Sequence, residues 1–257
     1  MSYRNVLCDR GDTIATITMN RPERRNALSL EHMEELIHAL REVGASDARA
    51  VVLAGNGPIF CAGHDFGDMV DRDLAGMRRL LAVCAELMAT VQGIPQPVVA
   101  RVHGLATAAG CQLVATADLA VAAADACFAT PGGRGGWFCT TPMVAVSRAI
   151  GRKRALQMLL TGDEIDAATA ADWGLVNRVV APERLVEETE ALARAASRGS
   201  TFSKSVGKHA FYAQIDLDQA HAYAYASEVM AMTALDRDGR EAIASFVEKR
   251  KPIYRNS

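Results

Sequence analysis

Short runs of β-branched and other apolar residues alternate with amphipathic segments through the first three-quarters of the chain. Residues Ile14 to Met19 are rich in β-branched side chains and follow a polar turn, which predicts a strand. Ser29 is placed to cap a helix, and apolar residues then recur at helical spacing as far as Gly44. Further apolar runs predict buried strands at residues 50–54, 98–102, 119–123 and 176–180. This alternation of strands and helices predicts an α/β fold.

From Pro182 onward, the pattern changes to helix almost throughout. Residues 220–232 form an alanine-rich stretch that also holds tyrosines and methionines. We therefore expect two parts, a core over residues 1–195 and a helical region over residues 196–257. The apolar content of residues 220–232 fits a buried subunit interface, although the core of a monomer would have the same pattern.

Composition and charge restrict the classes of function. The chain has 257 residues, half of them hydrophobic, which is enough to form a substantial core. A formal net charge of −2 with scattered basic residues argues against nucleic acid as a partner. No apolar run reaches the roughly 20 residues of a membrane helix, and the N-terminus has no signal or transit character. The six cysteines form no CxxC pair, and no spacing indicates a metal site. We therefore expect a cytoplasmic protein with buried free thiols, no metal and no membrane partner.

Two loops carry candidate chemistry. In the segment Phe60 to Phe66, the small pair at residues 62–63 lets a ligand approach the backbone, although the segment alone would be an ordinary loop. The segment Gly104 to Gln112 runs from a predicted strand into a helix, and N–H groups at a helix N-terminus suit a developing negative charge. Alone, this second segment could equally reflect close packing of helix on strand. Together the two segments fit an oxyanion hole, in which each loop offers one backbone N–H to a thioester carbonyl.

With these loops and two further segments, the whole chain resembles the enoyl-CoA hydratase/isomerase (crotonase) superfamily. Asn20 to Leu28 is similar to the N-terminal signature of that family, and Phe246 to Pro252 is similar to its C-terminal ending. Among its branches, residues 104–115 and 128–132 look most like the group of enoyl-CoA hydratase domain-containing protein 3. The resemblance implies a spiral of repeated ββα units followed by a helical C-terminal region, and assembly as a homotrimer or homohexamer.

The resemblance also implies site residues. The backbone N–H groups of Ala62 and Ala109 would form the oxyanion hole, and alanine at 109 keeps this donor if its φ is negative. No cofactor is implied, because the CoA thioester is itself the ligand. Phe246 and Lys249 would contact the adenine and the 3′-phosphate of CoA, often from a neighbouring subunit. The positions that would line the acyl-CoA are Arg25, Ala62, His64, Asp65, Phe66, Trp137, Phe246 and Lys249.

The usual acids are missing from this pattern. The hydratases of the family are expected to hold glutamates where this chain has Gln112 and Gly132. Adding water across a C2–C3 double bond requires a base at the water and an acid at carbon 2. An amide can orient a water but cannot accept a proton near neutral pH, and glycine has no side chain. We therefore expect hydration of 2-enoyl-CoA thioesters to be weak or absent. The alternatives are a non-catalytic acyl-CoA-binding protein, or another thioester-enolate reaction with a different proton donor.

Four side chains near these motifs also have plainer interpretations. A loop histidine such as His64 is ordinarily exposed, so a catalytic role for it is the minority interpretation. Asp65 is placed to cap the following turn or helix. Cys139 has no partner histidine nearby in the sequence that would make it a nucleophile. Trp137 is either a pocket wall or part of the core.

Overall fold

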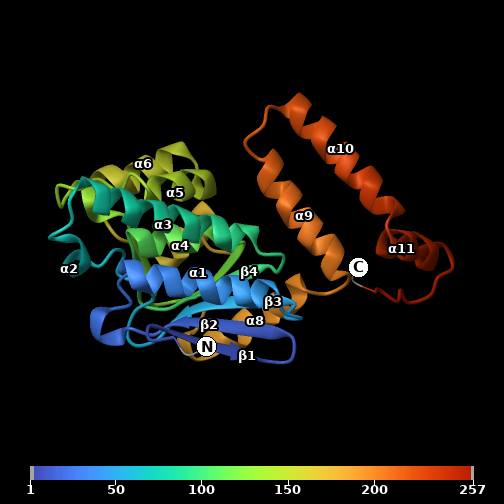
Figure 1. Ribbon diagram of the computed structural model, residues 1–257, viewed down its shortest axis with the longest axis horizontal. Helices are drawn as coiled ribbons and strands as arrows, with labels where there is room; N and C mark the ends of the chain where they lie inside the picture. The colour runs from blue at the N-terminus through green and yellow to red at the C-terminus, as the bar shows by residue number, and fades with distance from the viewer. Residues whose placement is uncertain (1–2, 256–257) are drawn as a thin grey trace.

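The computed structural model describes residues 3–255, and its centre is a six-stranded sheet (Figure 1). The first strand pairs antiparallel with the second, and all other neighbours in this sheet are parallel. The order across the sheet is β1 (Val6–Arg10), β2 (Ile14–Met19), β3 (Ala50–Gly55), β4 (Val98–Val102), β6 (Leu119–Ala123) and β9 (Arg178–Val180). A smaller three-stranded sheet has the order β5 (Leu105–Thr107), β7 (Cys127–Ala129) and β8 (Ile165–Asp166).

Helices cover both faces of the large sheet, as the nearly continuous apolar runs of its parallel strands require. Val51 and Leu53 of β3 join the larger core cluster, while Val52 joins a second cluster on the opposite face with Leu185. The helices are α1 (Leu30–Gly44), α2 (Phe66–Met69), α3 (Leu74–Gly93), α4 (Ala109–Thr116), α5 (Pro142–Ile150), α6 (Arg152–Thr161), α7 (Ala167–Trp173), α8 (Leu185–Ala196), α9 (Thr201–Gln214), α10 (Gln219–Leu235) and α11 (Arg237–Val247). Short 3-10 turns are η1 (Pro22–Arg24), η2 (Pro131–Gly133) and η3 (Pro182–Arg184).

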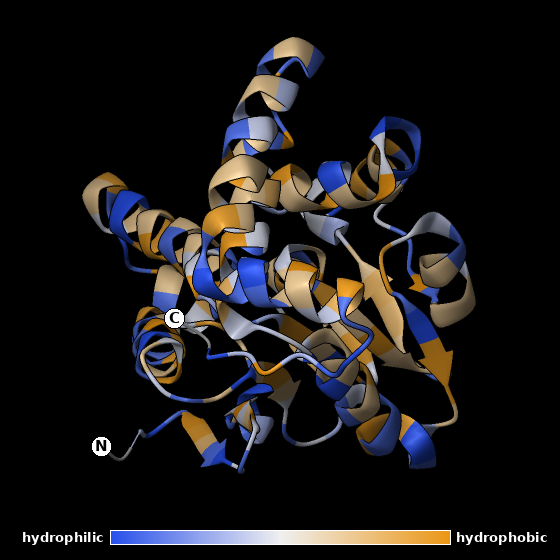
Figure 2. Ribbon diagram, turned by 90° about the vertical axis from the view of Figure 1, so that its right-hand side faces the viewer, coloured by the Kyte–Doolittle hydropathy of each residue, from blue (hydrophilic) through white to orange (hydrophobic). Residues whose placement is uncertain are grey.

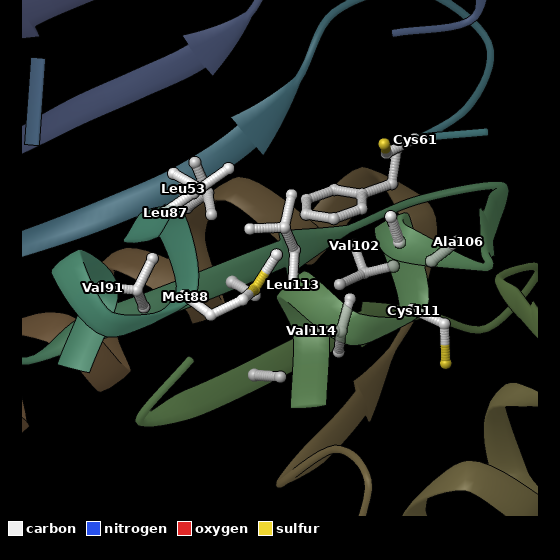
Figure 3. Packing of buried hydrophobic residues seen from close by; sticks show 14 of the residues in the cluster. Leu53, Cys61, Leu87, Met88, Val91, Val102, Ala106, Cys111, Leu113 and Val114 are labelled. Atoms are coloured by element: carbon white, nitrogen blue, oxygen red, sulfur yellow. The ribbon is translucent and has the colours of Figure 1, made fainter. Parts of the chain in front are cut away.

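The larger cluster fixes α4, whose N-terminus reaches the candidate site. Figure 3 shows Leu113 and Val114 of α4 among side chains of the strands and of α3. Leu53, Leu87 and Leu113 are at most 1% exposed, so α4 is held on several sides by close packing.

Beyond the core, α9, α10 and α11 form an arm that projects to one side of the molecule (Figure 1). A buried polar cluster fastens α9 to the core. The Lys208 ammonium lies 2.7 Å from an Asp118 carboxylate oxygen, and it donates to the carbonyls of Val91 and Gln96 at 2.9 Å each. The Tyr212 hydroxyl donates to the other Asp118 oxygen at 2.8 Å.

The rest of the arm is apolar but uncovered within one chain. Helix α10 has no buried residue, and Tyr223, Met230, Met232 and Leu235 are each at least 66% exposed. Figure 2 faces this side of the molecule and shows hydrophobic residues along the outer helices as well as in the central strands. An uncovered apolar surface of this extent is characteristic of an interaction surface.

Several sequence predictions agree with the structure in detail. The predicted strand at Ile14 to Met19 is β2, and Ser29 caps α1 by accepting a hydrogen bond from the His32 N–H.

The predicted last strand at 176–180 is shorter in the structure and begins only at Arg178. The N–H groups of residues 175 and 176 instead donate to the Ala170 carbonyl of α7. Within residues 3–255, no helix is long and apolar enough to span a membrane.

Candidate active site

Two loops that are far apart in the sequence meet at the N-terminus of α4. The Cys61 N–H donates to the Leu105 carbonyl at 3.2 Å, and the Thr107 N–H donates to the Cys61 carbonyl at 3.0 Å. Gly63 has a φ of +87°, and a Cβ at this position would lie 2.9 Å from the Ala108 Cβ and 3.2 Å from the Ala109 nitrogen. Only glycine therefore allows the two loops to approach this closely.

One of the two N–H groups that were predicted as oxyanion donors already has an acceptor in the structure. The Ala62 N–H, predicted as an oxyanion donor, donates instead to the Arg25 carbonyl at 3.0 Å. In the same loop, the His64 N–H has no acceptor among the described residues. The two hydrogen bonds that join this loop to Leu28 use the Gly63 carbonyl and the Asp65 N–H, which lie on either side of His64. The second predicted donor, Ala109, is the first residue of α4 and does not have a positive φ. The N–H groups of His64 and Ala109 are therefore two donors at this junction that have no acceptor within residues 3–255.

Ala108 holds the second donor in place through a strained backbone. Its φ is +50° and its ψ is −117°, a combination that favours glycine. Its own N–H donates to the Ala129 carbonyl at 2.9 Å, which anchors this conformation to β7. Because ψ of Ala108 orients the peptide plane that carries the Ala109 N–H, the strain fixes the direction of that donor.

A pocket of about 440 Å³ opens beside these donors. Its wall is mainly apolar and aromatic, as is usual for a small-molecule site. The Trp137 ring lies 6.0 Å from the His64 ring and 6.3 Å from the Phe66 ring, centroid to centroid. Trp137 is therefore part of the pocket wall rather than the core. The lining residues are Ala62, His64, Phe66, Leu81, Thr107, Ala108, Ala109, Pro131, Gly132, Arg134, Gly135, Trp137, Phe138, Cys139, Thr140, Thr141 and Pro142.

This lining contains no aspartate or glutamate, and the two positions of the expected acids differ in their surroundings. Gln112 is buried within α4, where its Oε1 accepts a hydrogen bond from the Cys84 thiol at 3.9 Å. It borders a different cavity on the side of α5 and α9, and it does not line this pocket. Gly132 does line the pocket, but a Cβ there would lie 2.2 Å from the Trp137 carbonyl oxygen. The backbone turn thus occupies the space of a side chain at 132.

His64 is buried, contrary to the expectation of an exposed loop histidine. It is 9% exposed, and neither ring nitrogen has a hydrogen-bond partner in the described part of the chain. Burial lowers the pKa of His64 below its ordinary value of 6.5, while the Leu28 backbone and the Asp68 carboxylate oppose this shift. The imidazole is therefore neutral around pH 7.

Asp65 fastens the loop rather than facing the pocket. It caps α2 by accepting a hydrogen bond from the Gly67 N–H, as predicted. It also forms ion pairs with Arg21 at 3.1 Å and Arg24 at 2.9 Å. Burial acts to raise the pKa of Asp65, but the hydrogen bonds from Arg24 and Arg21 outweigh burial and hold this pKa below its usual range.

The remaining predicted CoA contacts fall into two groups. Arg25 and Phe66 lie next to the pocket, because the Arg25 carbonyl accepts the Ala62 N–H and Phe66 lines the pocket mouth at 69% exposure. Phe246 is 84% exposed at the end of α11, and Lys249 follows it. Figure 1 shows α11 at the opposite end of the molecule from α2. One chain therefore does not bring Phe246 and Lys249 to its own pocket.

Sequence reasoning missed several residues of the pocket wall. Leu81 comes from α3, Thr107 from β5, and Thr140 from the segment before α5. No local motif marks these residues, because the fold brings them together from separate elements. Cys139 also lines the pocket, where burial raises the pKa of its thiol. All six cysteines are free thiols in the structure, as predicted, but Cys8 and Cys127 are only partly buried.

Comparison with known proteins identifies this architecture. The enoyl-CoA hydratase/isomerase family matches residues 9–257. The enoyl-CoA hydratase domain-containing protein 3 of Danio rerio, named as mitochondrial, is 41% identical over 254 residues, covering 98% of this chain and 88% of that protein. The structure of an enoyl-CoA hydratase from Mycobacterium smegmatis has a TM-score of 0.94 and 45% identity, covering 97% of this chain and 98% of that one. The structure of human enoyl-CoA hydratase domain-containing protein 3 has a TM-score of 0.93 and 39% identity, covering 97% of this chain and all 100% of that one. These matches confirm the predicted spiral fold with C-terminal helices, and the chain belongs to the enoyl-CoA hydratase/isomerase (crotonase) family.

Proposed function

We propose that this protein binds acyl-CoA thioesters in the pocket at the N-terminus of α4 and has weak or no 2-enoyl-CoA hydratase activity. The acyl group lies along the apolar wall that includes Trp137 and Phe138. The thioester oxygen accepts hydrogen bonds from the backbone N–H groups of His64 and Ala109. In well-studied enzymes one such donor contributes about 3–4 kcal/mol to stabilising an oxyanion. The observation that carries this proposal is that two residues lining one apolar pocket, His64 and Ala109, each have a backbone N–H without an acceptor within residues 3–255.

The weak hydratase activity follows from the composition of the pocket wall. No carboxylate is present among its lining residues to deprotonate a water or to protonate carbon 2. Gln112 borders another cavity, so its amide is not positioned to orient a water at the acyl group. The same absence of a carboxylate favours the second candidate function, a protein that binds acyl-CoA thioesters without converting them.

The rest of the CoA lies along the surface from Arg25 to Phe66, and the arm completes the site between subunits. Phe246 and Lys249 contact the adenine and the 3′-phosphate of a CoA that is bound to a neighbouring copy. A cation beside a phosphate is a favourable pair. The uncovered apolar surface of α10 supports assembly as a homotrimer or homohexamer, because assembly would remove this surface from water.

The test compares ligands that differ only in the thioester carbonyl. Butyryl-CoA and its thioether analogue S-butyl-CoA share the CoA moiety and the alkyl chain, but only butyryl-CoA has an oxygen for the two N–H groups. We expect calorimetry to show at least tenfold tighter binding of butyryl-CoA. Equal affinities for butyryl-CoA and S-butyl-CoA would show that the two N–H groups do not bind the thioester oxygen. In the same preparation, crotonyl-CoA should lose its enoyl absorbance more slowly than ~1 s⁻¹ per site, the low end of ordinary turnover. A faster rate would overturn the expectation of weak hydratase activity.

A further inference from the structure

Buried polar atoms without partners gather at the acyl pocket. Both ring nitrogens of His64 are in this state, and so is the Oγ1 of Thr107, a second lining residue. Thr130, directly before the lining residue Pro131, also has an unpartnered buried Oγ1. An unpaired buried polar group costs about 1–3 kcal/mol. A fold that retains several of them at one pocket is arranged for a ligand with polar atoms.

Among the lining residues, His64 is the side chain suited to moving a proton near neutral pH. The Arg134 guanidinium has only donor groups, and it forms an ion pair with Asp163 at 3.2 Å. Burial raises the pKa of the Cys139 thiol, so this group holds its proton. The hydroxyls of Thr107, Thr140 and Thr141 ionise far above neutral pH. An unbonded neutral imidazole keeps one nitrogen available as a proton acceptor.

We propose that the His64 imidazole is a catalytic acid–base group that removes and returns a proton at carbon 2 of the bound acyl-CoA thioester. This inference rests on the function proposed above. The neutral imidazole nitrogen takes the proton from carbon 2, and the electron pair of that C–H bond forms the C1–C2 double bond of the enolate. The carbonyl π pair moves to the oxygen, which the N–H groups of His64 and Ala109 stabilise. The imidazolium then returns a proton to carbon 2, so that no co-reactant is consumed.

One residue can serve both ends of this step. Carbon 2 is bonded to the carbonyl carbon, so a thioester whose oxygen reaches the His64 N–H has carbon 2 in the pocket that His64 also lines. The two roles can be separated experimentally, because substitution of the side chain leaves the backbone N–H in place. His64→Gln and His64→Asn keep a polar side chain of similar or smaller size but cannot act as a base near pH 7.

The experiment follows exchange of the carbon 2 hydrogens of butyryl-CoA with D₂O by NMR. We expect wild-type protein to catalyse exchange, and His64→Gln and His64→Asn to reduce the rate at least 100-fold, the lower range for general acid–base catalysis. Their affinities for butyryl-CoA should stay within about threefold of wild type. The control is His103→Gln, since His103 lies outside the pocket lining and bonds the Gly57 carbonyl. It should exchange at the wild-type rate.

The pH profile gives a second readout that a structural role would not produce. Exchange requires the neutral imidazole, so the wild-type rate should rise through one inflection below pH 6.5 and then level off, and the His64 variants should lack this inflection. The Asp68 carboxylate acts on His64 electrostatically, and Arg134 and Cys139 are the other charged or titratable side chains that line the same pocket. Two results would overturn this inference but not the proposed function. Wild-type protein could bind butyryl-CoA without exchanging its carbon 2 hydrogens, or the His64 variants could exchange these hydrogens at the wild-type rate. Wild-type protein that does not bind butyryl-CoA would overturn the proposed function as well.

Discussion

Adding a single methyl group at residue 132 tests whether the pocket wall is a tightly packed turn. In Gly132→Ala, the new Cβ would lie 2.2 Å from the Trp137 carbonyl oxygen and 2.8 Å from the Cys139 sulfur. The Gly132 carbonyl is also tied to this turn, because it accepts hydrogen bonds from the N–H groups of Trp137 at 2.9 Å and Gly135 at 3.1 Å. The backbone therefore cannot move away from the clash without breaking these bonds. Gly135→Ala is the matched control, since a Cβ there would meet only the Gly132 oxygen at 3.8 Å.

The expected magnitude follows from these distances. Ordinary heavy-atom contacts lie at about 3.5 Å, so the backbones at 132 and 137 must separate by roughly 1 Å. Forcing extra atoms into a packed site costs about 1–3 kcal/mol, and losing one backbone hydrogen bond costs about 0.5–1.5 kcal/mol more. Replacing glycine by alanine lowers the entropy of the unfolded chain equally in both variants. Gly132→Ala should therefore be about 2–4 kcal/mol less stable than Gly135→Ala.

Urea unfolding of both variants, followed by fluorescence at one protein concentration, measures this difference. The fixed concentration is needed because subunit association would shift the midpoint. If the turn detaches from the pocket instead of destabilising the whole fold, butyryl-CoA affinity should fall in Gly132→Ala and remain in Gly135→Ala. The reasoning is refuted if the two variants unfold at the same urea concentration and bind butyryl-CoA equally.

Three further predictions concern stability. Ala108→Gly should relieve backbone strain of about 1–3 kcal/mol, while the greater entropy of the unfolded glycine chain costs about 0.4–1 kcal/mol. Urea unfolding should therefore show a free energy of unfolding that is higher by about 1 kcal/mol. A lower free energy of unfolding would contradict a strained φ of +50° at residue 108. Lys208→Met leaves Asp118 without its cation and should destabilise the fold by about 3 kcal/mol in the same urea experiment. The control is Lys204→Met on the exposed side of the same helix, which should stay within about 0.5 kcal/mol of wild type. Equal effects of the two substitutions would show that the ion pair does not fasten α9. Burial lowers the pKa of His32 from 6.5 to about 4, so the unfolded chain takes up this proton first and stability should fall by about 3 kcal/mol as the pH drops through that window. His32→Leu should flatten this fall in unfolding experiments between pH 7 and 4, and an unchanged slope would assign it to other groups.

Local patterns were sufficient to predict most of the core. The strand at Ile14 to Met19 follows from β-branched residues, and the start of α1 follows from the Ser29 cap, since both depend on neighbours within a few positions. Each of the two loops of the site had an ordinary interpretation alone, and only the two together predicted an oxyanion hole. The pairing of these loops was recognisable from the order of several motifs along the chain, and in the structure hydrogen bonds join the two loops.

The finer assignments depend on contacts across the fold and could not be read from the sequence. The first loop is hydrogen-bonded to Arg25 and Leu28, and the register of this pairing decides which of its N–H groups stays free. The Ala62 N–H is used by Arg25, so the free N–H is that of His64. Burial of His64 depends on Trp137, which comes from a distant segment. The need for glycine at 132 arises from a local turn, in which the Trp137 carbonyl folds back on Gly132 in a way that the sequence did not indicate.

The contact between Gly132 and the Trp137 carbonyl also limits which sequences can be reached from this one. A change of Gly132 to glutamate would supply the carboxylate that hydratases of the family are expected to hold, but its Cβ would occupy the same place as that of any other side chain. A carboxylate at 132 therefore requires a different path for residues 133–137. Single substitutions at 132 are penalised by the backbone rather than by the chemistry of the new side chain. A route from this sequence to a two-carboxylate hydratase is thus easiest when the loop changes first, while the pocket still lacks an acid.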